Sequence, residues 1–272
     1  MPQHIIAQIE SCLDDMTRLE QDIASYFLDA QNKHYDLSSA AVSQQLHVSP
    51  AALTRFAQKC GFKGYREFIF EYENSQKHLD SQFQHIHRDL TKRVLVDYKE
   101  IVDMTNALVD EDKLERVAHL LDKASRVYFY GIGSSGLVAR ETKLRFTRLG
   151  LVCDAITDAD NMVWTNSILD ETCLVFALSL TGQTQSILNS LEIAAKKGAK
   201  TVLISTQNPD GFVFDEHVAV ASVRHLNYGN RISPQLPLLM MIDIIYAYYL
   251  SIDKTTKETI FKDTLVDDNN LR

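Results

Sequence analysis

Cysteine is scarce in this chain of 272 residues, and its four cysteines lie far apart, at positions 12, 60, 153 and 173. The chain has no Cys-x-x-Cys pair and no Cys and His residues at zinc-ligand spacing, which argues against zinc fingers and disulfide-stapled secreted folds. Isolated thiols of this kind are typical of a reducing compartment. We therefore expect a cytoplasmic protein with neither a metal ion nor a cofactor.

Long apolar runs are also absent. The longest, Leu236 to Leu250, contains Asp243 and is too short to cross a bilayer, so it predicts a buried core helix. Residues 1–20 carry acids early and lack the basic start and apolar stretch of a signal peptide. The sequence thus predicts no membrane partner.

Positive charge is in short supply, because 28 Lys and Arg residues face 36 Asp and Glu residues for a formal net charge of −8. This balance argues against a protein that coats nucleic acid without regard to sequence. A small basic surface that reads DNA remains compatible with it, since the clustering of cations matters more than their total. Such a cluster is present between Ser49 and Arg66, where Arg55, Lys59 and Lys63 also lie and no acid occurs.

Glycine and proline are few, 10 and 5, and no stretch has the composition of a flexible linker. The length exceeds one average domain. Residues 1–75 show helical spacing and no convincing strand, whereas short β-rich runs alternate with helical runs from about residue 110. We predict a helical domain over residues 1–75, a connecting helix over 76–103 and an α/β domain over 104–272.

The helical segment contains the pattern of a helix-turn-helix unit. A helical run over residues 40–46 leads to a short turn at residues 47–49. Ser49 is placed to cap a second helix that has Pro50 in its first position, and Gly61 closes that helix. In such a unit the second helix enters the major groove of DNA with its N-terminal residues at the bases.

The alternating segment predicts a parallel sheet with helices on both faces. The predicted strands are Arg126–Tyr130, Cys153–Thr157, Cys173–Leu178, Lys200–Ser205 and His217–Ala221. The helices between them include Leu137–Leu149, Gln185–Lys197 and Pro234–Leu250. The predicted fold class is therefore an all-α helix-turn-helix head followed by an α/β three-layer domain with a mainly parallel five-stranded sheet.

Two of the predicted strands end in loops suited to an anion. The run GIGSSG at residues 131–136 follows the first strand, and the run SLTGQT at residues 179–184 follows the third. Ligands of open α/β sheets lie beyond the carboxyl ends of the strands, where N–H groups at a helix start favour phosphate. Hydroxyl groups add donors, and Gly182 lets the backbone approach a ligand closely. Neither loop ends like a nucleotide P-loop, and the first lacks dinucleotide spacing.

Residues 104–251 resemble a sugar isomerase (SIS) domain, whose hallmarks are a serine-rich loop after the first strand and an S-x-[ST]-G-x-T loop after a later one. The resemblance implies that a sugar phosphate binds here, with its phosphate on the second loop and its sugar on the first. The implied ligand residues are Ser134, Ser135, Ser179, Thr181, Gln183 and Thr184. Gln183 stands where isomerising members often carry Glu, which weakens any claim of catalysis.

Residues 16–70 resemble the N-terminal domain of the RpiR family of bacterial transcriptional regulators. The matching positions include the run VSPA at residues 48–51, Leu53, Arg55 with Phe56, and above all the run CGFKGY at residues 60–65 with Phe68. The two resemblances cover most of the chain in the order that this family has. Helix-turn-helix geometry nominates base-reading residues at the start of the second helix and phosphate contacts beyond it. The DNA-binding candidates are Ser49, Pro50, Ala51, Thr54, Arg55, Gln58, Lys59, Lys63 and Arg66.

We predict a sugar-phosphate-responsive transcriptional regulator that represses a carbohydrate catabolic operon. Its expected partners are a palindromic operator DNA, a phosphorylated sugar effector and further copies of itself, as a homodimer or a tetramer. An N-acetylhexosamine 6-phosphate is the favoured effector, because Asn161, Trp164 and Asn166 could line a bulkier pocket.

Two alternatives stay open at this stage. A sugar-phosphate isomerase would need a general base near the sugar, for which His217, His225 and Glu216 are the candidates. A scaffold with a vestigial site is the other alternative. The intact hydroxyl groups of the second loop argue against it.

Overall fold

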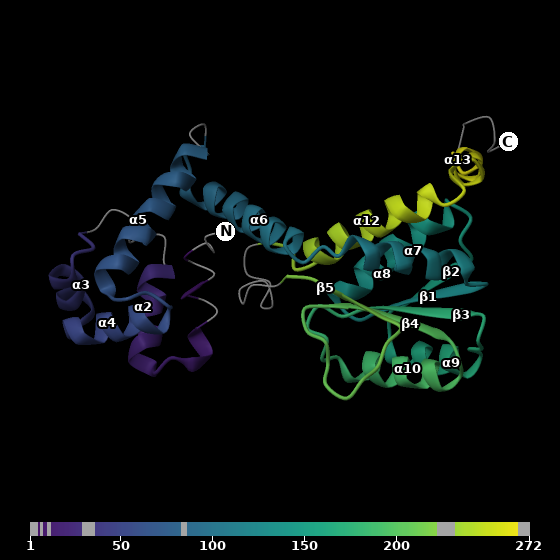
Figure 1. Ribbon diagram of the computed structural model, residues 1–272, viewed down its shortest axis with the longest axis horizontal. Coiled ribbons are helices and arrows are strands. Elements are labelled where there is room, and N and C mark those ends of the chain that lie inside the picture. The colour runs from purple at the N-terminus through teal and green to yellow at the C-terminus, as the bar shows by residue number, and fades with distance from the viewer. Residues whose placement is uncertain are drawn as a thin grey trace. The chain divides into compact units, whose positions relative to one another are not determined.

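The structure, a computed structural model, describes residues 5, 8–9, 12–28, 36–82, 86–221 and 232–265. These residues form two compact units, whose boundary in the sequence falls between Glu100 and Ile101, except that Ile232 groups with the first unit. We call the unit before this boundary the head and the unit after it the body (Figure 1).

The regular structure in the described part of the head is helical. Ser38 and Ser49 cap the starts of two of its helices. The side-chain oxygen of each accepts a hydrogen bond from the backbone N–H of the residue three positions later. His47 takes the left-handed conformation in the turn between them, with φ of 52°. The helices are η1 (Leu13–Asp15), α2 (Arg18–Leu28), α3 (Ser39–Leu46), α4 (Pro50–Lys59) and α5 (Tyr65–Gln82). The predicted sequence of helix, short turn and helix is confirmed.

An aromatic cluster holds α2, α4 and α5 together. Phe27 and Phe68 pack edge to face with their ring centroids 4.9 Å apart, and Phe56 stacks on Phe27 at 5.8 Å. Burial of this kind commits one face of α4 to the core and leaves its other face exposed. Leu53 and Phe56 belong to this core, and Leu46, Val48 and Phe62 pack against it.

The segment predicted as one connecting helix over residues 76–103 is divided between two helices. α5 runs to Gln82, α6 (Asp89–Asn106) begins anew, and residues 86–88 before it are not helical. The single helix expected from the sequence is thus two. The pattern could not locate the break, because apolar residues keep helical spacing through it, at Leu79, Phe83, Ile86 and Leu90.

The body is built on a five-stranded sheet in the order β2-β1-β3-β4-β5, with every neighbouring pair parallel. Its strands are β1 (Arg126–Gly131), β2 (Cys153–Ile156), β3 (Cys173–Leu178), β4 (Lys200–Ser205) and β5 (Glu216–Ala219). The predicted fold class is confirmed, and the sheet is parallel throughout rather than mainly so.

Helices cover both faces of this sheet (Figure 1). Strand side chains alternate between the faces, so that Phe129 and Phe176 belong to one core cluster while Tyr130 and Val175 belong to the other. The first cluster is completed by α7 (Glu111–Lys123), α8 (Ser134–Thr147) and α12 (Leu236–Ser251). The second is completed by α9 (Ala159–Ser167) and α10 (Gln185–Lys196).

The apolar helix α12 is the core helix that the sequence predicts, since Leu238, Met241 and Ile242 are buried against the sheet. A last helix, α13 (Lys254–Asp263), follows it. Within the described residues, no single helix is long and apolar enough to span a membrane; α12 and α13 meet that test only as a pair bent by 109°.

Candidate functional site

The strand order creates a switch point between β1 and β3. The chain passes from β1 to β2 on one side, and from β3 to β4 and β5 on the other. β1 and β3 are direct neighbours, with Gly131 opposite Leu178 at their carboxyl ends. α8 leaves β1 toward one face of the sheet, and α10 leaves β3 toward the other. Open α/β sheets bind their ligands at such a point, outside the carboxyl ends of the strands.

The two predicted anion loops come together at this edge. In the second loop, the Ser179 Oγ atom lies 3.1 Å from the Thr184 Oγ1 atom. Ser179 is buried and Thr184 is half-buried. When one hydroxyl of such a pair donates to the other, the acceptor keeps its own hydrogen for a ligand. The pair is therefore able to donate to an anion at the mouth of the loop.

The other predicted ligand residues surround this pair. Ser134 and Ser135 form the first turn of α8, and the first is exposed while the second is buried. The Thr181 Oγ1 atom accepts a hydrogen bond from the Gln183 backbone N–H at 3.2 Å, and both side chains are exposed. The structure thus brings all six predicted residues to one edge of the sheet. Their contact with a ligand stays a prediction.

Both helices that start at this edge lack a side-chain cap. α8 begins after Gly133 and α10 after Thr184, and neither residue bonds the N–H groups of the first turn through its side chain. Uncapped N–H groups carry partial positive charge and bind anions. Side chains cap α3, α4, α7 and α9, through Ser38, Ser49, Asp110 and Asp158, whereas α12 and α13 also lack such a cap. What distinguishes this edge is that two uncapped helix starts lie beside the hydroxyl groups of the second loop, a combination that the sequence reasoning missed and that suits an anion.

Gly182 has a structural requirement of its own. Its φ is +68°, and a Cβ atom there would lie 2.5 Å from the Gln207 backbone oxygen. That oxygen accepts a hydrogen bond from Ser205 Oγ at 2.6 Å, and Ser205 Oγ lies 2.9 Å from His217 Nε2. Because a serine has one hydrogen, His217 is the donor in the second contact. Close packing against the loop after β4 therefore explains this glycine without any ligand.

The candidates for a catalytic base have other partners. Burial, followed by the charge of Lys113, lowers the pKa of His217, whose Nε2 atom is bonded to Ser205. Glu216 forms an ion pair with Arg116. His225 lies outside the described residues. These structural bonds argue against the isomerase alternative.

The three residues expected to line an enlarged sugar pocket do not act together. Asn166 is buried, and its Oδ1 atom accepts a hydrogen bond from the Tyr130 hydroxyl at 3.0 Å. Asn161 bonds Asp158 at the start of α9, and the Trp164 side chain is exposed. The expectation for Asn166 was wrong, because the side chain turns into the core to pair with a buried tyrosine.

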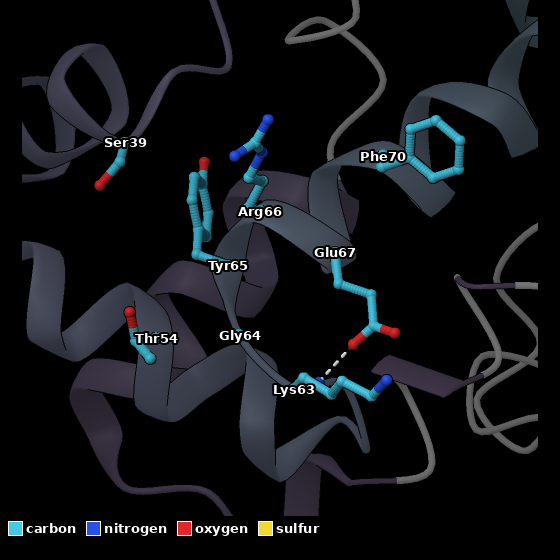
Figure 2. A pocket seen from close by; sticks show the side chains of 8 residues that line it. All are labelled: Ser39, Thr54, Lys63, Gly64, Tyr65, Arg66, Glu67 and Phe70. Carbon is cyan, nitrogen blue, oxygen red and sulfur yellow. Dashed lines mark hydrogen bonds between the residues drawn. The ribbon is translucent and has the colours of Figure 1, made fainter.

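The predicted DNA-binding residues lie on and beside the outer face of α4. Ser49, Pro50, Ala51, Arg55 and Gln58 are exposed, because the opposite face of the helix carries the core residues. Beyond the helix, Lys63 and Arg66 line a groove of about 700 Å³ at the start of α5, together with Ser39, Thr54, Gly64, Tyr65, Glu67 and Phe70 (Figure 2).

The hydroxyl groups of two of these candidates form local structural bonds. The Ser49 hydroxyl caps α4, as the sequence predicts, by accepting from the Ala52 N–H at 3.2 Å. The Thr54 hydroxyl donates to the Pro50 carbonyl at 3.1 Å. By contrast, Arg55 and Arg66 have no ion-pair partner among the residues that the structure describes. Their guanidinium groups are available to an external anion.

Lys59 is held within the head. Its ammonium group donates to Glu20 at 3.0 Å and to the Asp15 carbonyl oxygen. Burial alone would raise the pKa of Glu20, but hydrogen bonds from Thr17 and Lys59 outweigh it and hold the pKa below 4.5. A role in DNA contact therefore stays a prediction for Lys59, alongside a structural role that the sequence did not indicate.

Replacing Lys59 by methionine is expected to lower the free energy of unfolding of the head by about 1–2 kcal/mol at pH 7, since a nearly buried carboxylate loses a partner. A depressed carboxyl pKa stabilises the fold above its unfolded value and loses that contribution as the pH falls. The difference from the wild-type protein should therefore shrink below about pH 4. Urea unfolding at several pH values measures this loss of stability, with the exposed Lys63→Met as the control. Equal losses of stability in both variants would contradict a structural role for Lys59.

Family models match both parts of the chain. The model described as the helix-turn-helix domain of the rpiR family matches residues 3–77, and the SIS domain model matches residues 120–253. An uncharacterized HTH-type transcriptional regulator of Clostridium perfringens is 25% identical over 253 residues, which are 89% of this chain and 91% of that protein. One of Haemophilus influenzae is 26% identical over 256 residues, 90% of this chain and 89% of that protein.

Solved structures share the fold. The Vibrio vulnificus NanR protein, solved in complex with ManNAc-6P, covers 96% of both chains with a TM-score of 0.60 and 18% identity. The sugar isomerase domain of an RpiR transcription factor from Sphaerobacter thermophilus covers 65% of this chain and 98% of its own, with a TM-score of 0.59 and 18% identity. With a matching helix-turn-helix head, a matching SIS body and regulators as relatives along most of its length, the chain belongs to the RpiR family of transcriptional regulators.

Proposed function

We propose that this regulator represses a carbohydrate catabolic operon from the cytoplasm and leaves its operator when a phosphorylated sugar binds to the body. The observation that carries the proposal is the pair of uncapped helix N-termini at the β1–β3 switch point, beside the hydroxyl groups of Ser179 and Thr184. The loops at residues 131–136 and 179–184 contain no charged side chain. Backbone N–H groups and hydroxyls would therefore hold the phosphate there, as they do at other helix starts.

An N-acetylhexosamine 6-phosphate is the effector class that we place first. The support is indirect, from the ManNAc-6P in the Vibrio vulnificus NanR structure, which has the same fold. Ser134 and Ser135 on α8 would face the sugar, while Thr181 and Gln183 on the second loop are exposed and would contact the ligand from there.

We further propose that two copies act together on a palindromic operator, with a tetramer as the larger assembly. A symmetric pair of heads matches half-sites about one helical turn of DNA apart, or a multiple of that spacing. Within each head, the start of α4 would read bases through Arg55, and Lys63 and Arg66 would bind phosphates at the start of α5.

The two modes of DNA contact predict different phenotypes. Arg55→Ala is expected to cost about 1–3 kcal/mol against the operator and to relax one base preference, because an arginine can bind guanine with two hydrogen bonds. Lys63→Ala should weaken binding to all sequences alike and reduce the dependence of log K on log salt by about one unit. Fluorescence anisotropy with operator and random duplexes, over a salt series, separates the two. Unchanged operator affinity in Arg55→Ala would place the base-reading surface elsewhere.

A direct test of the function begins with thermal shifts over pentose, hexose and N-acetylhexosamine phosphates, with the unphosphorylated sugars as matched controls. The best ligand is then added to an operator titration. Coupling of about 1–3 kcal/mol between the sites would lower operator affinity roughly 5- to 150-fold at saturation. A protein that binds its operator equally well with every saturating sugar phosphate would refute the proposal, and turnover of any of them would favour the isomerase.

A further inference from the structure

The start of the second loop, residues 179–184, is bonded to the end of β4. The Ser179 N–H donates to the Ile204 carbonyl at 3.1 Å, and the Thr206 N–H donates to the Leu180 carbonyl at 2.9 Å. These two bonds continue the pairing of β3 with β4 past the last residue of each strand. The course of the loop as it leaves β3 is therefore set by its neighbour in the sheet.

The middle of the second loop rests on Gln207. The carbonyl oxygen of Gln207 packs so closely against Gly182 that a Cβ atom there would lie 2.5 Å from it. The side chain of Gln207 contacts the next residue of the loop, because its Oε1 atom accepts a hydrogen bond from Gln183 Nε2 at 3.2 Å. Thr184, whose hydroxyl belongs to the candidate phosphate site, follows directly. A movement of Gln207 would therefore displace the part of the loop that leads into this hydroxyl.

Gln207 is held in place by two side chains behind it. The fully buried Ser205 hydroxyl donates to the Gln207 carbonyl at 2.6 Å, and His217 Nε2 lies 2.9 Å from the same hydroxyl. A serine hydroxyl has one hydrogen and rotates freely unless its partners fix it. By donating to the oxygen of Ser205, His217 leaves that hydrogen for Gln207. Without the imidazole, nothing in this chain of bonds fixes the orientation of the hydroxyl.

His217 itself lies outside the candidate phosphate site. It belongs to β5, at the edge of the sheet, and is paired with Leu203 of β4. Backbone pairing fixes β5 beside β4, but the contact that reaches the second loop runs through side chains. The bonds lead from His217 on β5 to Ser205 on β4, and from there through Gln207 to the loop after β3. A residue two strands away is thus connected to the shape of the phosphate loop.

We propose that His217 is a positioning residue for the effector, which holds the second loop in its phosphate-binding shape through Ser205 and Gln207. The inference rests on the proposed function, since it concerns the same phosphate site. That site has no charged side chain in its two loops, so the phosphate depends on backbone N–H and hydroxyl donors that converge on it. Such donors must be held to within about 0.5 Å by the residues behind them, and a loop ordered in advance lowers the cost of binding.

Isothermal titration of the full-length protein with two probes tests the proposal. Inorganic phosphate probes the loop whichever sugar the effector carries, and N-acetylglucosamine 6-phosphate represents the effector class placed first. H217L and S205A are each expected to raise the Kd for both probes by about tenfold, because the loop loses its support. Since His217 acts only through Ser205, the double variant should bind within about threefold of S205A alone. Losses that multiply to about 100-fold would show independent effects and overturn the proposal.

Two amide replacements separate positioning by a hydrogen bond from simple filling of space. In H217Q the amide nitrogen lies as many bonds from Cα as the Nε2 atom of histidine does, so it can donate to Ser205. This variant should keep the Kd for both probes within about threefold of the wild type. In H217N the amide nitrogen lies one bond closer to the backbone and cannot reach, so the Kd should rise as in H217L. Equal affinities of the two amide variants would contradict a role for the donor.

Thr201 supplies the matched control at the opposite ends of the same two strands. Its hydroxyl donates to Asp215 Oδ2 at 3.2 Å and accepts from the Asp215 N–H at 3.3 Å, just before β5 begins. T201V therefore removes a side-chain link between β4 and the start of β5, far from the second loop along both strands. It should lower the Tm and leave the Kd for both probes unchanged.

The outcomes distinguish this inference from the proposed function. If T201V weakens binding as much as H217L does, general loosening of the sheet explains the loss and the positioning role is wrong. If the wild-type protein binds the probes and H217L binds them equally well, this inference alone fails. A wild-type protein that binds neither probe would refute the proposed phosphate site, and the role of His217 with it.

Discussion

The double variant Ser179→Ala, Thr184→Ala is expected to bind the sugar phosphate at least about 100-fold more weakly and to lose the effector response of operator binding, while DNA affinity without effector stays at the wild-type level. Each hydroxyl supplies a hydrogen bond to a charged group, worth about 1.5 kcal/mol or more. The two hydroxyls are 3.1 Å apart and bond each other in the ligand-free protein. Removing both leaves no unpaired group behind, whereas removing one strands the other, so the double change should be nearly neutral for folding.

Isothermal titration with the effector and an operator titration with and without it measure the two parts of this expectation. The matched control is Ser190→Ala, which removes a buried hydroxyl in α10, the helix that begins after Thr184. This variant should bind the effector normally. A double variant that still responds fully would place the phosphate site outside the β1–β3 switch point.

Replacing Lys257 by methionine is expected to lower the free energy of unfolding of the body by about 3 kcal/mol, which corresponds to a fall of roughly 6–12 °C in its Tm. Lys257 is 6% exposed. Its ammonium group donates to Asp122 Oδ1 at 2.7 Å, to the Tyr249 carbonyl at 2.8 Å and to the Ile252 carbonyl at 2.7 Å. It also lies 3.6 Å from the centroid of the Tyr249 ring.

All three ammonium hydrogens are therefore used to tie α13 to α7 and to the end of α12. Methionine keeps an unbranched side chain only one atom shorter but leaves the two carbonyls and the carboxylate without their donor. Lys254→Met on the same helix is the control, because its exposed pair with Glu258 at 3.6 Å is worth less than about 0.5 kcal/mol. If differential scanning calorimetry gives the same Tm for the two variants, the bonds of the buried Lys257 do not stabilise the body.

The two loops illustrate how far sequence reasoning reached toward the site. Their hydroxyl groups, their position after buried strands and the helices that follow are all local features, and they identified the six candidate ligand residues. From the sequence, only the family resemblance implied that the two loops lie next to each other. The strand order shows it, because β1 and β3 are neighbours in the sheet. The sequence analysis explained Gly182 by the close approach of a ligand. Close contact with Gln207, 25 positions later, is enough to require a glycine there.

Two other residues have long-range partners that the sequence did not indicate. Asn166 was assigned to a sugar pocket and is instead buried against Tyr130, a partner 36 positions away. Lys59 was predicted to contact DNA, which stays a prediction, and it also bonds Glu20, a partner 39 positions away. In both cases the structural partner lies on another element, and no pattern within one helix records such a contact.

The sequence by itself determined the local structure of this protein: the helix-turn-helix head through Ser49, Pro50 and Gly61, the five strands through their apolar runs, and the family through both motifs in order. These features depend on residues a few positions apart, where caps, turns and periodicity act. Only the tertiary structure decided the strand order, the break before α6, the uncapped helix starts at the switch point and the partners of Lys59 and Lys257. Those depend on which surfaces meet when the chain packs, and packing joins residues by shape and burial irrespective of their distance along the sequence.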